Sequence, residues 1–105
     1  MLEVTEEKRS GWCVVGVRGR ADAITAQELE SKLCGAIQRN LQVAADLSAL
    51  EYISSSGLRA VLQAAREAQS RKVRFAVCAM TAPVKKVFDI SGVQNLLEMH
   101  GELPC

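Results

Sequence analysis

The sequence is poor in the side chains that most often carry out catalysis or stack on nucleic-acid bases. It has one histidine, one Trp, one Tyr and two Phe among 105 residues, and its 13 Lys and Arg nearly balance 12 Asp and Glu. A nucleic-acid groove needs clustered basic residues with aromatic side chains beside them, and here the basic residues are scattered. We therefore expect no nucleic-acid partner and interpret most charges as solvated surface.

Long hydrophobic runs are also absent. No stretch approaches the roughly 18 apolar residues that span a bilayer, and the first ten residues, MLEVTEEKRS, contain no apolar signal core. We therefore expect a soluble, cytoplasmic protein that does not insert into membranes.

The cysteines lack the spacing of a metal or redox site. Cys13, Cys34, Cys78 and Cys105 lie far apart without a C-x-x-C pair, and His100 is the only histidine that could join them. Cys13 and Cys78 stand within apolar runs, where a reduced thiol behaves as a small hydrophobe. We expect no bound metal and no cofactor.

What the sequence does contain is an alternation of β-branched runs with amphipathic, helix-like stretches. Its length suits a single domain, residues 1–105. Because strands that alternate with helices need crossover connections, we expect an α/β fold with a mixed, mostly parallel sheet of four or five strands and helices packed on it. The expected elements are a hairpin around Glu7–Gly11, a helix over Ala26–Arg39, a strand over Val43–Leu47, a helix that starts at residues 54–56, a strand over Val73–Cys78, a helix between Thr81 and Gly92, and an edge strand over Leu96–Met99.

The first helix has a clear start signal. Thr25 and Glu28 have the spacing of a capping box, in which a hydroxyl is followed three residues later by a carboxylate. We expect the Thr25 hydroxyl to cap this helix.

Three consecutive serines, Ser54, Ser55 and Ser56, pose the main question of the sequence. The expected layout places them just after a central strand and at the start of a helix, the edge where open α/β sheets carry functional loops. One hydroxyl can cap the helix, which is worth about 1 kcal/mol. That structural role explains only one of the three serines.

A catalytic serine is a poor explanation. The nucleophile elbow G-x-S-x-G needs a glycine two residues before the serine, where Ile53 precedes Ser55. The only histidine, His100, lies in a segment that we expect at the edge of the sheet, and no lysine is close in sequence. We expect no catalytic residue and no enzymatic activity.

A phosphorylated serine is a better explanation. The start of a helix presents unpaired N–H groups and the positive end of the helix dipole, so it can hold a phosphoryl group without unfolding. Phosphorylation adds about −1.5 to −2 charges, which repels a partner that had docked on a neutral surface. Such a modification switches binding off while the fold stays intact.

The residues around the serines resemble a known signature. Asp46-Leu47-Ser48 and the later stretch YISSSGL (52–58) resemble STAS domains, specifically bacterial anti-sigma factor antagonists, in which D-L-S is followed by an apolar pair and D-S-S-G-L. Gly19-Arg20-Ala21-Asp22 resembles the G-x-L-D turn of that family, and residues 84–99 resemble its third helix and last strand. The resemblance covers nearly the full chain.

This resemblance implies a partner switch. The unphosphorylated antagonist binds an anti-sigma factor that is also a serine kinase, and the bound kinase releases its captive. The kinase then phosphorylates the antagonist, and a PP2C-type phosphatase resets it. The family position of the phosphorylated serine falls on Ser55. Because Ser54 replaces the acidic residue of the family, Ser54 and Ser56 remain alternative sites.

We expect the partner to dock around Ser55. Several of the docking residues also have structural explanations: Asp22 in a turn, Gly57 in close packing or at a positive φ, and Leu58 in the core. Arg59 either contacts an acidic kinase surface or is simply solvated. The expected docking surface comprises Asp22, Ser54, Ser56, Gly57, Leu58 and Arg59.

Two further expectations concern Asp46 and the type of partner. Asp46 is expected to hold its loop by accepting backbone N–H bonds. A second hypothesis for the whole chain is a constitutive STAS scaffold that packs on a transporter subunit without any kinase.

Overall fold

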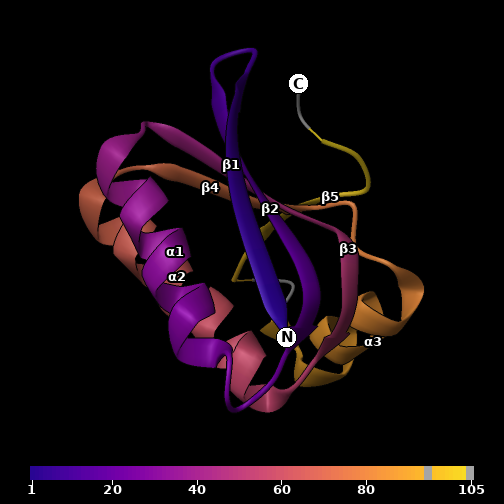
Figure 1. Cartoon of the computed structure of the whole chain (residues 1–105). Coiled ribbons are helices and arrows are strands. Elements are labelled where there is room, and N and C mark those ends of the chain that lie inside the picture. The colour runs from indigo at the N-terminus through magenta and orange to yellow at the C-terminus, as the bar shows by residue number, and fades with distance from the viewer. Residues whose placement is uncertain (94–95, 104–105) are drawn as a thin grey trace.

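A mixed sheet with strand order β1-β2-β3-β4-β5 forms the centre of the fold, as described for residues 1–93 and 96–103 by this computed structural model (Figure 1). β1 is antiparallel to β2, and the other neighbouring strands are parallel. The predicted α/β fold is confirmed. In chain order the elements are β1 (Leu2–Arg9), β2 (Trp12–Ala21), α1 (Ala26–Arg39), β3 (Gln42–Ile53), α2 (Ser55–Arg71), β4 (Arg74–Cys78), α3 (Ala82–Ser91) and β5 (Glu98–His100).

The predicted hairpin forms with a turn shorter than the sequence suggested. Arg9 pairs with Trp12, so only Ser10 and Gly11 connect β1 to β2. Both have positive φ, 49° and 85°, as the two central residues of a type I′ turn require.

Most of the core lies on one face of the sheet. Figure 1 shows α1 and α2 side by side against the sheet and α3 beside the far end of β3. One cluster of buried apolar side chains joins β2 and β3 to these helices, with Leu33 of α1, Val61 of α2 and Phe88 of α3 almost inaccessible to solvent. A smaller cluster occupies the other face and consists of Trp12, Val14, Ala44, Ala76 and Cys78.

β3 is longer than the predicted Val43–Leu47. Asp46 is its last residue paired with β4, opposite Cys78, but the strand continues along β2 until Ile53 pairs with Ala21. This extension has only one neighbouring strand and carries exposed residues between buried ones, so it lacks the continuous apolar run of a central strand. Two register irregularities against β2 mean that the seven residues of β3 after Asp46 run beside only five of β2, so at about 3.3 Å per residue the end of β3 lies roughly 17 Å beyond Asp46.

The predicted bounds of α1 are confirmed, but the predicted side-chain cap at its start is not. α1 spans the predicted Ala26–Arg39, yet the Thr25 side chain makes no cap hydrogen bond, so the expected capping box is wrong. Its hydroxyl accepts the Asp22 N–H and donates to the Arg20 carbonyl, at 3.0 and 2.9 Å, and is thereby used within the preceding loop.

The third helix and the last strand lie close to their expected positions. Thr81 occupies the N-cap position of α3 without a side-chain cap bond, and Gly92 ends the helix with φ 71°, as predicted. β5 is an edge strand beside β4, displaced by one to two residues from the predicted Leu96–Met99.

The described cysteines are buried or partly buried thiols. Cys13 and Cys78 are buried as expected, burial raises the pKa of the Cys13 and Cys34 thiols, and Cys105 lies outside the described residues. Within residues 1–93 and 96–103, no helix has the length and apolar character that crossing a membrane requires.

Candidate functional site

Ser54 is the residue that joins β3 to α2. Its backbone is extended, with φ −91° and ψ 176°, and its side-chain oxygen accepts the Gly57 N–H at 3.2 Å, which is N-cap geometry. Its own N–H donates to the Ala21 carbonyl at 2.8 Å, and its carbonyl accepts the Leu58 N–H at 2.9 Å. The hydroxyl and the backbone of Ser54 therefore both serve the structure.

Ser55 is placed differently. It is the first residue of α2, its side chain is exposed, and no hydrogen bond links its hydroxyl to another residue in the described part of the chain. Ser56, by contrast, is half-buried. The first turn of α2 contains no acidic residue, so the positive end of this 17-residue helix is not neutralised from within. Of the three serines, Ser55 is the one that is exposed to solvent at the start of a helix.

Gly57 allows the start of α2 to pack closely against the ends of β2 and β3. A Cβ at this position would lie 2.7 Å from the Ala21 carbonyl oxygen and 2.9 Å from Ile53 Cγ1. Its φ is not positive, so space rather than backbone conformation requires glycine here. Leu58, only 6 % exposed, belongs to the core. Of the expected docking residues, these two chiefly position the others.

Asp22 holds the loop that follows β2. Its Oδ1 accepts the N–H groups of Ile24 and Thr25, both at 3.0 Å, and lies 3.1 Å from the Thr25 hydroxyl oxygen. The hydrogen bonds from Thr25 and Ile24 keep the pKa of Asp22 below its ordinary value, so the carboxylate that they need persists at neutral pH. The Ala21 carbonyl, at the start of this loop, accepts the Ser54 N–H, so the hydrogen bond holds the loop next to the serine run.

The structure adds exposed apolar and aromatic residues to this edge of the sheet. Ile24 is 89 % exposed although the Asp22 carboxylate anchors its backbone. Arg20 and Tyr52 are register partners on β2 and β3, and the guanidinium lies 4.3 Å from the ring centroid. Their only signals in the sequence are an isolated isoleucine in a polar turn and a tyrosine just before the serines.

Of the other two predicted residues, Arg59 faces solvent and Asp46 forms a local hydrogen bond. Arg59 is exposed one turn after Ser55 on α2. Asp46 accepts the Ser48 N–H at 3.0 Å, as expected, although both residues lie within β3 rather than in a loop.

His100 is remote from the serine run. It pairs in register with Cys78, level with Asp46, so the whole extension of β3 separates it from the serine run. Its Nε2 lies 2.7 Å from Glu98 Oε2. In residues 1–93 and 96–103, no group of three or more His, Cys, Asp or Glu is placed to hold a metal ion.

Comparison with known proteins gives concordant matches. The family model described as "STAS domain" matches residues 3–103. A protein of Bordetella bronchiseptica, provisionally named anti-sigma factor antagonist BtrV, is 32% identical over 96 residues, which cover 90% of this chain and 83% of the relative.

Solved structures share the fold. An anti-sigma factor antagonist from Mycobacterium paratuberculosis has a TM-score of 0.87 at 24% identity, covering 98% of this chain and 88% of that one. SpoIIAA, a Bacillus cell fate determinant and anti-sigma factor antagonist, matches in its unphosphorylated form (TM-score 0.74, 22% identity, 92% and 87% covered). It also matches in its phosphorylated form (TM-score 0.68, 21% identity, 92% and 90% covered).

Substitutions at Ser54 and Ser55 distinguish the serine that caps α2 from the serine whose hydroxyl makes no hydrogen bond in the described part of the chain. Ser54→Ala is expected to lower the free energy of unfolding by about 1 kcal/mol because the Gly57 N–H loses its acceptor, whereas Ser54→Asp keeps the cap. Ser55→Ala is expected to stay within about 0.5 kcal/mol of wild type. Urea unfolding followed by far-UV circular dichroism measures these differences, and equal losses for Ser54→Ala and Ser55→Ala would contradict the assignment of the cap.

Gly57→Ala tests the close packing at the start of α2. The added methyl overlaps the Ala21 carbonyl, so we expect a loss of about 1–3 kcal/mol in the same unfolding assay. Gly35→Ala is the matched control, because a Cβ there meets only the end of the Arg39 side chain at 3.8 Å. This control is expected to gain about 0.5–1 kcal/mol from helix propensity. A Gly57→Ala protein as stable as wild type would show that the contact is not tight.

Proposed function

The chain belongs to the STAS domain family, and we propose that it acts, as a single domain in the cytoplasm, as the anti-sigma factor antagonist of a partner switch. In its unphosphorylated form it binds an anti-sigma factor that is also a serine kinase, and this binding releases the captive of the kinase. Phosphorylation of Ser55 ends the interaction, and a PP2C-type phosphatase restores it.

The division of roles between Ser54 and Ser55 carries this proposal. Ser54 is half-buried and its side-chain oxygen already accepts the Gly57 N–H as the cap of α2, so its hydroxyl is less accessible to a kinase. Ser55 makes no such contact among the described residues, and its hydroxyl is exposed at the positive end of α2. Ser55 is therefore the most accessible hydroxyl of the three and the one without a structural contact, whereas Ser54 and Ser56 are both half-buried.

The surroundings of Ser55 explain why a phosphate would block binding. The neighbouring edge exposes Ile24 and the Arg20–Tyr52 pair, which suits contact with the surface of another protein. A phosphate would place about −1.5 to −2 charges within that contact, and a docked partner would have to desolvate them. The unpaired N–H groups at the start of α2 stabilise the same charge. The phosphate would therefore leave the fold intact while it weakens the interface.

The named relatives support this role. BtrV and the Mycobacterium paratuberculosis protein are both described as anti-sigma factor antagonists. SpoIIAA has been solved with and without phosphate, and both forms superpose on this chain over 92% of its length. A STAS fold that persists in the phosphorylated state is what the proposed switch requires, and the switch needs no catalysis by this chain.

Binding to the kinase from the same cell tests the proposal. In a pull-down with purified kinase, wild type and Ser55→Ala are expected to bind comparably, while Ser55→Asp binds at least about tenfold more weakly because it introduces an unpaired charge at the interface. Ser31→Asp, the same change on the exposed surface of α1, is the matched control and should bind like wild type. Equal binding by all four proteins would exclude a switch at Ser55. A chain that scaffolds a transporter subunit would bind no kinase at all.

A further inference from the structure

A groove runs along α2 from Ser55 toward the middle of the helix. It has a volume of about 440 Å³ and lies between α2 and the end of α3. Ser55, Arg59, Leu62 and Arg66 line it at helical spacings of four, three and four residues, so they form a single stripe. The groove therefore begins at the candidate phosphorylation site and extends about three turns beyond it.

The charge in this groove is of one sign. Arg59 and Arg66 are both exposed, and neither has an ion pair or hydrogen bond with any residue in the described ranges. No Asp or Glu is among the lining residues. Four other arginines have carboxylate partners among the described residues, as in the Arg71–Glu67 and Arg74–Glu98 pairs, while Arg18 and Arg20 have none. Two unneutralised guanidinium groups thus face a groove without a compensating carboxylate in its lining.

The floor of the groove is apolar. Of its lining residues, Leu58 and Val93 are each 6 % exposed, and Leu62 is half-buried. Ile90, next to the lining residue Ser91, is 76 % exposed. A protein segment with carboxylates and apolar side chains complements this combination of arginines and apolar surface.

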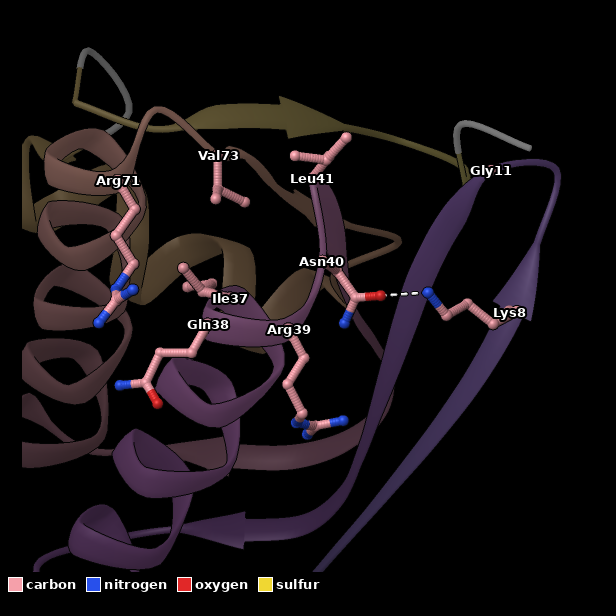
Figure 2. Close-up of a pocket in the computed structure, with 9 residues that line it drawn as sticks. All are labelled: Lys8, Gly11, Ile37, Gln38, Arg39, Asn40, Leu41, Arg71 and Val73. Atoms are coloured by element: carbon pink, nitrogen blue, oxygen red, sulfur yellow. Dashed lines mark hydrogen bonds between the residues drawn. The ribbon is translucent and has the colours of Figure 1, made fainter.

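A second hollow at the opposite end of the domain shows the contrast (Figure 2). It also has basic residues, but each has a partner: Lys8 donates to Asn40 Oδ1, and Arg39 pairs with Glu6 at 2.8 Å. Arg71, the third, pairs with Glu67. This hollow lies at the carboxyl ends of α1 and α2, where the helix dipoles favour cations and disfavour a bound anion. Its basic residues are explained by the fold, whereas Arg59 and Arg66 are not.

We propose that the groove between α2 and α3 binds an acidic segment of the anti-sigma factor kinase, with Arg59 and Arg66 contacting its carboxylates. This inference rests on the proposed function, because it extends the contact around Ser55 by three helical turns. It makes binding depend on a residue, Arg66, that is eleven positions beyond the modified serine and has no part in the switch itself.

The test is a charge reversal at Arg66 with a matched control. Arg66→Glu is expected to weaken binding of the purified kinase at least about tenfold, since a repulsive charge replaces an attractive one. Arg18→Glu makes the same change at an exposed arginine on β2 outside this groove, and it should bind within twofold of wild type. Hydrogen exchange of the wild-type complex should also show protection at residues 62–66. Circular dichroism of both variants checks that the fold is retained.

The outcomes separate this inference from the proposed function. If Ser55→Asp abolishes binding but Arg66→Glu binds like wild type, the groove proposal is wrong and the switch stands. If Arg66→Glu and Arg18→Glu weaken binding equally, net charge rather than the groove is responsible, and the proposal is again wrong. If the wild-type protein does not bind the kinase, both proposals fail together.

Discussion

The contact between the start of α2 and the end of β2 is the constraint on which the site depends. The Ser54 N–H bonds to the Ala21 carbonyl, the Ser54 hydroxyl caps the helix, and Gly57 leaves no room for a side chain between the two elements. Since the contact uses Ser54 and Gly57, it leaves Ser55 between them without a structural task. The same contact holds the Asp22 loop beside the serines. In this loop the Ile24 side chain is exposed while its backbone N–H is hydrogen-bonded to Asp22.

This arrangement separates stability from recognition at neighbouring residues. Buried side chains of β3 and α2, such as Ile53 and Leu58, belong to the core, while Ser55 and Arg59 face solvent. In the proposed switch, a charge added at Ser55 meets favourable helix N–H groups on the protein side and an unfavourable, desolvated environment on the partner side. A difference of a few kcal/mol between these two environments changes binding by several powers of ten without any change in the backbone.

The sequence predicted those features whose signals are local. The bounds of α1 and the Gly92 stop of α3 follow from helical spacing and turn residues, and the serine run points to the candidate site. The sequence did not predict the length of β3, because its extension pairs with β2 alone and alternates exposed with buried residues. The Asp22 turn in place of a Thr25 cap, and the groove with its unpaired arginines, depend on contacts between segments distant in the chain.

The most direct measurement is phosphosite mapping by mass spectrometry after incubation with the cognate kinase and ATP, with a Ser54→Asp protein analysed in parallel. Because Ser54 is committed to the cap and Ser55 is free, phosphate should appear on Ser55 in both proteins, and the backbone amide exchange of α2 should stay protected. Phosphate on Ser54 or Ser56 with Ser55 unmodified, or no phosphate between Tyr52 and Arg59, would contradict the central claim that this one exposed hydroxyl controls the interface.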